Sequence, residues 1–187
     1  MAHISLRENL PGIVGLLAFR PETAQPLGVF TDALLQGPSP LSRAEREMIA
    51  AHVSFRNDCH FCRQSHAAVG AAHLGGREQD HALFEAVQVD PASAPVTPKM
   101  KALLAIAGLV QRDGKAVTAE AIEAARREAA SDVEIHDTVL IAAAFCMFNR
   151  YVDGLGTWQP DAPAAYRGMG QQIAEGGYAL AGARAGA

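Results

Sequence analysis

The sequence is short of cysteine, aromatic residues and long apolar runs, and each shortage excludes a class of protein. Three cysteines among 187 residues are too few, and odd in number, for a secreted fold held together by disulfides. The longest strongly apolar run, from Val139 to Phe148, is about half of the ~20 residues that a membrane-spanning helix needs. The apolar segment from Ile13 to Phe19 lacks the basic flank and the cleavage site of a signal peptide. We therefore expect a cytoplasmic protein with no membrane partner.

Positive charge is also scarce. The chain has 16 Lys and Arg residues against 20 Asp and Glu, which gives a formal net charge of −4, and its pI is about 5.9. The basic residues form no tract along the sequence. A nucleic-acid partner requires a concentrated basic surface that neutralises phosphates, so we expect no such partner.

Alanine is in excess, at 37 positions, whereas aromatic residues make up only 6% of the chain. Alanine is the strongest helix former, and its small side chain allows helices to approach closely. Helix caps and breakers recur along the chain, and alternating strand patterns do not. We predict an all-α fold with one domain over residues 1–187, in which residues 10–160 form the core and residues 161–187 form a C-terminal helix and an Ala/Gly tail.

Capping signals set most of the predicted helix boundaries. Ser42 and Glu45 form a Ser-x-x-Glu capping box, and Thr97, Thr118 and Ser131 stand at the N-cap positions of later helices. The expected helices are, in chain order, 10–19, 21–36, 42–55, 59–74, 77–87, 98–112, 118–130, 131–155 and 162–175.

The residues suited to chemistry are concentrated between Glu47 and His66, in the segment EMIAAHVSFRNDCHFCRQSH. Cys59 and Cys62 form a C-x-x-C pair in the first turn of an expected helix, for which Asp58 is the predicted N-cap. At ~100° per residue, Cys59, Cys62 and His66 fall on one helix face within roughly 60°. Cys62 and His66 are four residues apart, so the thiol and the imidazole can meet.

This placement is typical of a reactive thiol. A helix N-terminus and a neighbouring imidazole lower the pKa of a thiol from about 8.5 towards neutrality. The second cysteine supplies a partner for an intramolecular disulfide. Glu47 lies on the preceding helix, seven residues before Ser54. If the two helices pack antiparallel, the Glu47 carboxylate can approach His66 and either orient it or accept its proton.

The same residues allow other interpretations. A structural zinc site could use three ligands from this segment and one further histidine. The candidate ligands are Cys59, Cys62 and His66, with His60, His52 or His73 as the fourth. The spacing of the three is unlike that of the usual zinc sites, so we favour redox chemistry and expect no metal or other cofactor. Taken alone, Glu47 is an ordinary solvated helix residue, and Cys146 is expected to be an unreactive core thiol.

The arrangement of Glu47, Ser54, Cys59, Cys62 and His66 resembles the signature of the AhpD-like alkylhydroperoxidase and carboxymuconolactone decarboxylase superfamily. Flanking segments are similar to the peroxidase-related branch of that superfamily. These segments are Arg20-Pro21-Glu22, Leu41-Ser42-Arg43 and the Phe148-Asn149-Arg150 … Asp153-Gly154 ending of the long helix. The resemblance covers residues 10–160 and implies an all-helical bundle that assembles as a trimer or a hexamer.

The resemblance implies thiol-dependent reduction of a hydroperoxide substrate. In that activity Cys62 attacks the peroxide, and Cys59 resolves the sulfenic acid to a disulfide. His66 and Glu47 relay the proton, and a dithiol reductant or adaptor protein recycles the disulfide. Phe61 departs from the pattern, because some hydroperoxidases of this group carry a histidine there. The decarboxylase branch lacks the cysteine pair, so the resemblance disfavours that activity.

A redox sensor or disulfide-exchange protein with little peroxidase turnover would use the same residues, and the sequence does not separate it from an enzyme. A homo-oligomer is expected on a second ground. Alanine-rich helices and the apolar tail from Tyr178 to Ala187 would leave apolar surface exposed in a monomer.

Overall fold

The centre of the fold is a pair of helices joined by a tight turn, α3 (Arg43–Arg56) and α4 (His60–Leu74). The computed structural model describes the backbone of residues 2–185 and the side chains of residues 2–178. Because only residues 57–59 connect the two helices, α3 and α4 run antiparallel, and they pack closely against each other. This is the packing on which the predicted approach of Glu47 to His66 depends.

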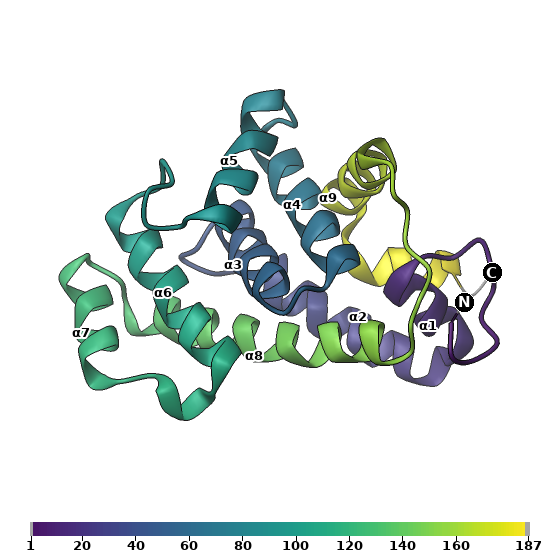
Figure 1. Ribbon diagram of the computed structural model, residues 1–187, viewed down its shortest axis with the longest axis horizontal. Coiled ribbons are helices and arrows are strands. Elements are labelled where there is room, and N and C mark those ends of the chain that lie inside the picture. Colours follow the sequence, from purple (N-terminus) through teal and green to yellow (C-terminus); the bar gives the residue numbers. More distant parts are fainter. Residues whose placement is uncertain (1, 186–187) are drawn as a thin grey trace.

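The other helices surround parts of this pair. They are α1 (Gly12–Phe19), α2 (Pro21–Leu35), α5 (Glu78–Val89), α6 (Pro98–Arg112), α7 (Ala119–Arg127), α8 (Asp132–Gly154) and α9 (Pro163–Ala185). In Figure 1, α8 runs below the pair, α5, α6 and α7 lie to its left, and α1 and α9 lie to its right. No strand occurs between residues 2 and 185, so the all-α prediction is confirmed. In this described part, no helix combines the length and the apolar character needed to cross a membrane.

Local sequence signals account for most of the helix boundaries. In the predicted capping box of α3, the Glu45 amide donates to Ser42 Oγ over 3.2 Å, and the Ser42 amide donates to Glu45 Oε2 over 2.8 Å. The side chains of Thr97, Thr118 and Ser131 cap α6, α7 and α8 as predicted. These caps satisfy backbone amides that have no partner inside their own helices.

Two clusters of buried apolar side chains hold the helices together. The larger cluster joins α3, α6 and α8 through fully buried residues such as Ile49, Leu103 and Ile141. The smaller cluster surrounds the first turn of α4 and consists of Leu16, Cys59, Phe61, Cys62, Ala68, Val152 and Tyr166. The cysteine pair is therefore part of a packed core, and not of a surface loop.

The end of the chain differs from the prediction. The sequence predicts a last helix over 162–175 and then an apolar tail, but α9 continues to Ala185 across a kink at Gly177. Gly177 has a φ of +76°, which a residue with a side chain rarely adopts. Tyr178 follows the kink and packs against the larger cluster instead of lying on an exposed tail. The side chains of 179–187 lie outside the described residues, so the expected oligomer stays a prediction.

His52 on α3, one of the candidate zinc ligands, is a core residue. It is 2% exposed, its Nδ1 has no hydrogen-bond partner, and its ring donates to the Val87 carbonyl. Burial, together with the positive charge of Arg56, lowers the pKa of His52 to about 4. The histidine is therefore neutral in the folded protein at neutral pH.

We expect the free energy of unfolding to fall as the pH is lowered from 6.5 to about 4. In this range the unfolded His52, with an ordinary pKa of about 6.5, binds a proton that the folded His52 does not, so acid favours unfolding by up to about 3 kcal/mol. Urea unfolding at pH 7 and at pH 4.5 measures this loss, which should be smaller in His52→Gln. The exposed His136→Gln is the control. Equal losses in His52→Gln and in the wild type would contradict the expectation.

Candidate functional site

A left-handed turn places the two cysteines at the start of α4. Asp58 has a φ of +56°, which is unusual for a residue with a side chain. The predicted N-cap at Asp58 is wrong, because Asp58 supplies the turn between the helices and Cys59 is the N-cap. The Cys59 amide donates to the Ser54 carbonyl over 3.0 Å. Cys62 is the third residue of α4, where amides without intrahelical partners favour a negative charge.

A network of side-chain amides fixes this turn against α6 and α8. Asn57 Nδ2 donates to Asn149 Oδ1 over 2.8 Å, and Asn149 Nδ2 donates to Ser54 Oγ over 3.0 Å. Gln111 donates to Asn57 Oδ1 over 2.8 Å, and Cys146 lies half-buried beside the network. Ser54 and Asn149 are buried. The serine of the sequence signature therefore supports the turn that carries the cysteines.

Both cysteines of the pair are free thiols, and both are buried. The Cys59 thiol donates a hydrogen bond to Cys62. This hydrogen bond raises the pKa of the Cys59 thiol, and burial and the negative charge of Asp153 add to the effect. Cys59 therefore stays protonated and acts as a donor.

Glu47 and His66 come together as the antiparallel packing predicts. His66 Nδ1 lies 2.7 Å from Glu47 Oε2. The Glu47 side chain is fully buried, and that of His66 is 11% exposed, so Glu47 is not the solvated helix residue that it would be on sequence grounds alone. Phe145 packs edge-on against the imidazole with 4.4 Å between the ring centroids. These contacts fix the ring and leave its Nε2 on the side away from the carboxylate.

Tyr178 completes this cluster, although the sequence predicts that it lies in an apolar tail. Its hydroxyl donates to Glu47 Oε1 over 2.8 Å and lies 3.1 Å from His66 Nδ1. Its backbone amide donates to Asp32 Oδ1 over 2.6 Å. The sequence Gly176-Gly177-Tyr178 is the one local signal of this arrangement, since paired glycines mark a bend in the chain.

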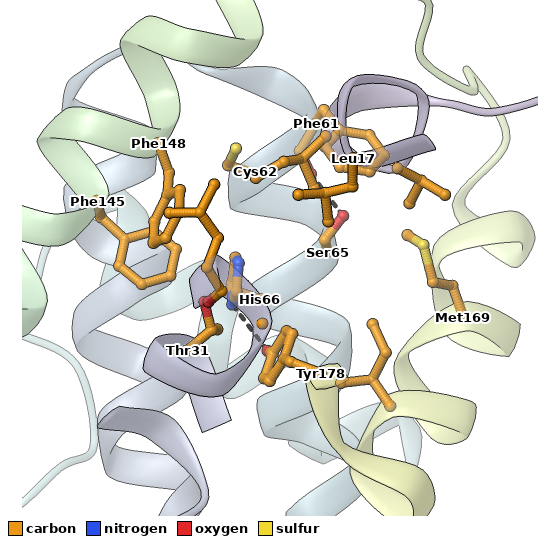
Figure 2. A pocket seen from close by; sticks show the side chains of 15 residues that line it. Leu17, Thr31, Phe61, Cys62, Ser65, His66, Phe145, Phe148, Met169 and Tyr178 are labelled. Carbon is orange, nitrogen blue, oxygen red and sulfur yellow. Dashed lines mark hydrogen bonds between the residues drawn. The ribbon is translucent and has the colours of Figure 1, made fainter. Parts of the chain in front are cut away.

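A mostly apolar cavity of about 80 Å³ lies over these groups. Figure 2 shows Cys62, His66 and Tyr178 around it, with Phe145 and Phe148 on one side and Met169 on the other. Its further lining residues are Ile13, Val14, Leu17, Leu27, Gly28, Thr31, Phe61, Ser65 and Ile173. A space of this volume holds a few water molecules or a small polar group with a short apolar tail. None of the 15 lining side chains is a lysine or an arginine.

Phe61, the residue that departs from the sequence pattern, forms part of the cavity wall. It is 3% exposed, and its ring lies 6.0 Å from that of Tyr166. His60, one position earlier, is not a lining residue, because its ring packs edge-on against Tyr166 and its Nδ1 lies 3.3 Å from Arg63. The positions between the cysteines therefore give the cavity an apolar surface and no group that carries a proton.

The zinc interpretation finds no support in the geometry. Within the part of the chain that is described, no three His, Cys, Asp or Glu side chains are grouped so that they could hold a metal ion. His66 Nδ1 is occupied by Glu47 and Tyr178, and His73 Nε2 lies 3.3 Å from the Gln36 amide. Cys59, Cys62 and His66 are therefore not grouped as the ligands of one metal ion.

Gly70 allows α4 to approach Glu47 closely. A Cβ atom at residue 70 would overlap the Phe84 ring and lie 3.0 Å from Glu47 Cβ. We expect Gly70→Ala to lower the free energy of unfolding by about 2 kcal/mol, because the overlap outweighs the gain in helix propensity. Urea unfolding measures the change. The control is Gly168→Ala on α9, where no atom beyond the adjacent backbone of the same helix lies within 4 Å of the added methyl group. Equal stability of the two variants would contradict the close packing at Gly70.

A family model described as the carboxymuconolactone decarboxylase family matches residues 21–96, which include Glu47, both cysteines of the pair and His66. The match ends before α6 and so does not reach Tyr178. Among curated proteins, none matches the sequence.

Solved structures match over most of the chain. An uncharacterized peroxidase-related protein from Silicibacter sp. TM1040 is 28% identical with a TM-score of 0.74, over 84% of this chain and 79% of its own. A second such protein, described as an alkylhydroperoxidase AhpD core, comes from Ralstonia eutropha JMP134. It is 27% identical with a TM-score of 0.74, over 86% and 81% of the two chains. A protein of unknown function from Agrobacterium tumefaciens, named as a candidate antioxidant defence protein AhpD, shares the fold. It is 23% identical with a TM-score of 0.66, over 84% of this chain and 100% of its own.

Proposed function

Since the chain belongs to the AhpD-like and carboxymuconolactone decarboxylase superfamily, in its peroxidase-related branch, we propose that it is a thiol-dependent peroxidase. In this proposal the Cys59–Cys62 dithiol reduces hydroperoxides, and His66 and Glu47 relay the proton. The observation that carries the proposal is the 2.7 Å contact between Glu47 and His66 beside a cavity that Cys62 also lines. A carboxylate, an imidazole and a thiol in sequence form the arrangement that activates a nucleophile.

The first step forms a sulfur–oxygen bond. His66 accepts the proton of the Cys62 thiol, and the thiolate attacks the terminal oxygen of the hydroperoxide. The oxygen–oxygen bond breaks, Cys62 becomes a sulfenic acid, and the leaving alkoxide takes the proton from His66 to become an alcohol. Sulfur is oxidised by two electrons, and the peroxide is reduced by the same two.

The second step forms the disulfide. Cys59 loses its proton to the neighbouring Asp153 carboxylate and attacks the Cys62 sulfur. Hydroxide leaves from the sulfenic acid and takes up a proton to become water, and a Cys59–Cys62 disulfide results. A dithiol reductant or adaptor protein then reduces the disulfide. The reduction proceeds by thiol–disulfide exchange through a mixed disulfide with the reductant.

The composition of the cavity favours this reaction over lactone decarboxylation. A decarboxylase substrate carries a carboxylate, whose burial requires a cation or several donors. The cavity lining includes no lysine or arginine and is mostly apolar. An uncharged hydroperoxide enters such a space without an electrostatic penalty.

Mass spectrometry after the addition of one equivalent of peroxide tests the proposal. We expect a disulfide between Cys59 and Cys62 to form before Cys146 is modified, because Cys146 has neither a helix N-terminus nor an imidazole beside it. Oxidation of Cys146 first, or at an equal rate, would count against the assignment.

A redox sensor with little turnover is the second candidate, and the burial of the dithiol favours it. Cys59 is 0% and Cys62 3% exposed, so a reductant reaches them only if the surrounding helices move. A steady-state peroxide assay with several dithiol reductants separates the two functions. Turnover faster than that of a free thiol supports the peroxidase, and turnover no faster supports the sensor.

A further inference from the structure

Tyr178 reaches the Glu47–His66 pair from a distant part of the chain and contacts both members. The phenol oxygen lies 2.8 Å from Glu47 Oε1 and 3.1 Å from His66 Nδ1. The two rings are nearly parallel, with 5.8 Å between their centroids. The titratable groups that face Tyr178 are Glu47 on α3, Asp32 on α2, and His66 and Cys62 on α4. The phenol has one proton, so it can donate to only one of these two groups.

The number of available protons fixes the hydrogen bonds. Burial raises the pKa of Tyr178 well above its ordinary value, and the negative charges of Glu47 and Asp32 add to the effect, so the phenol keeps its single proton. That proton is donated to Glu47 Oε1. The His66 Nδ1 atom then faces two acceptors, Glu47 Oε2 and the phenol oxygen, and has to carry a hydrogen itself.

On this basis we infer that Tyr178 is a positioning residue that acts on His66 through Glu47. Its hydroxyl group weakens the hold of the carboxylate on the imidazolium proton, while Nδ1 keeps its hydrogen and Nε2 stays free to accept the proton of Cys62. This inference rests on the proposed function, because it takes the Cys62 thiol as the group that gives its proton to His66. Nε2 lies on the side of the ring away from Glu47, and Cys62 stands one helical turn earlier on α4 beside the same cavity.

The backbone conformation around Tyr178 directs this side chain towards Glu47 and His66. The left-handed φ of +76° at Gly177 turns the chain inwards, and Asp32 Oδ1 accepts the Tyr178 amide over 2.6 Å. A Cβ atom at residue 177 would lie 3.0 Å from the same Asp32 oxygen. Because these contacts do not involve the hydroxyl group, Tyr178→Phe should keep the ring in place and remove only the hydrogen bonds.

The test compares Tyr178→Phe with Tyr166→Phe. Tyr166 is a matched control, since its ring is buried and its hydroxyl donates to the Pro160 carbonyl over 2.9 Å without touching Glu47 or His66. In Tyr178→Phe we expect kcat/KM for a small organic hydroperoxide to fall about tenfold. We also expect the acidic limb of the pH profile to move up by about one pH unit. A carboxylate that has lost its phenol donor holds the imidazolium proton more tightly, so the base becomes available only at higher pH. Tyr166→Phe should change neither quantity.

A second measurement does not depend on activity. In ¹⁵N NMR titrations of the reduced protein, we expect neutral His66 to carry its hydrogen on Nδ1 in both proteins, and the imidazolium of Tyr178→Phe to persist to about one pH unit higher than that of the wild type. Gly177→Ala, which misplaces the ring without altering the hydroxyl, should reproduce the shifted pH profile of Tyr178→Phe.

The outcomes separate the inference from the proposed function. A wild-type protein that forms no disulfide with peroxide overturns the proposed function, whatever the tautomer of His66. A wild-type protein that forms the disulfide, but in which Tyr178→Phe leaves the pH profile and the NMR titration unchanged, overturns the inference. A uniform fall in rate at every pH, without movement of the acidic limb, also overturns it, since that result indicates a structural role only.

Discussion

Cys62→Ser is expected to reduce hydroperoxide consumption by more than about a thousandfold, to the rate of the buffer alone. A serine hydroxyl is not ionised by an imidazole at neutral pH and does not form a stable oxygen adduct with peroxide, so neither chemical step remains. Peroxide consumption with a dithiol reductant measures the effect. Because Cys62 is buried at the start of α4, far-ultraviolet circular dichroism is recorded in parallel, and Cys62→Ala serves as a second variant without a buried hydroxyl. Full turnover in either folded variant would contradict the assignment of Cys62.

The partner cysteine should behave differently. Cys59→Ser is expected to consume one equivalent of peroxide and then stop, with Cys62 as a sulfenic acid that dimedone traps, because the resolving thiol is absent. Cys146→Ser is the matched control, since this third cysteine lies half-buried beside Asn57, outside the cavity lining. It should turn over at the wild-type rate. Trapping of the sulfenic acid on Cys59 in a Cys62→Ser protein would reverse the two roles.

Much of this site was predictable because its parts are local in sequence. The capping box at Ser42 fixes where α3 begins, and therefore which face of α3 carries Glu47. A turn of three residues forces α4 to run back along α3, and the spacing of Cys62 and His66 puts both on one helix face. The approach of Glu47 to His66 follows from those facts, and the two side chains lie 2.7 Å apart.

Tyr178 was not predictable in the same way, since its place depends on the tertiary packing of α9. The family model ends at residue 96, and the spacing from residue 178 back to Glu47 carries no periodic signal. The predicted N-cap at Asp58 failed for a related reason, because Asp58 adopts a left-handed conformation that its sequence neighbours do not require, and Cys59 takes the N-cap position. Short-range patterns thus predict which groups react, whereas long-range packing determines which groups hold them in place.

Glu47→Gln is expected to lower kcat/KM for hydroperoxide by about a hundredfold or more, although the side chain keeps its size. An amide has one acceptor and one donor atom where the carboxylate has two acceptors. If the amide nitrogen faces His66, it donates to Nδ1, so the ring proton moves to Nε2 and the base for Cys62 is lost. If the amide oxygen faces His66, the nitrogen meets the Tyr178 hydroxyl, which loses its acceptor. Either orientation breaks one bond of the cluster.

Stability measurements distinguish this chemical role from a structural one. A buried neutral amide costs less desolvation than a buried carboxylate, so the free energy of unfolding of Glu47→Gln should equal or exceed that of the wild type. The control is Glu85→Gln on the exposed face of α5, which should change neither rate nor stability. A wild-type rate in Glu47→Gln would show that His66 needs no carboxylate to serve as the base. A large loss of stability together with an unchanged rate per folded molecule would assign Glu47 to the core alone. We expect a variant that is slow but stable, because the buried carboxylate is needed for its negative charge beside His66 and not for the packing of the core.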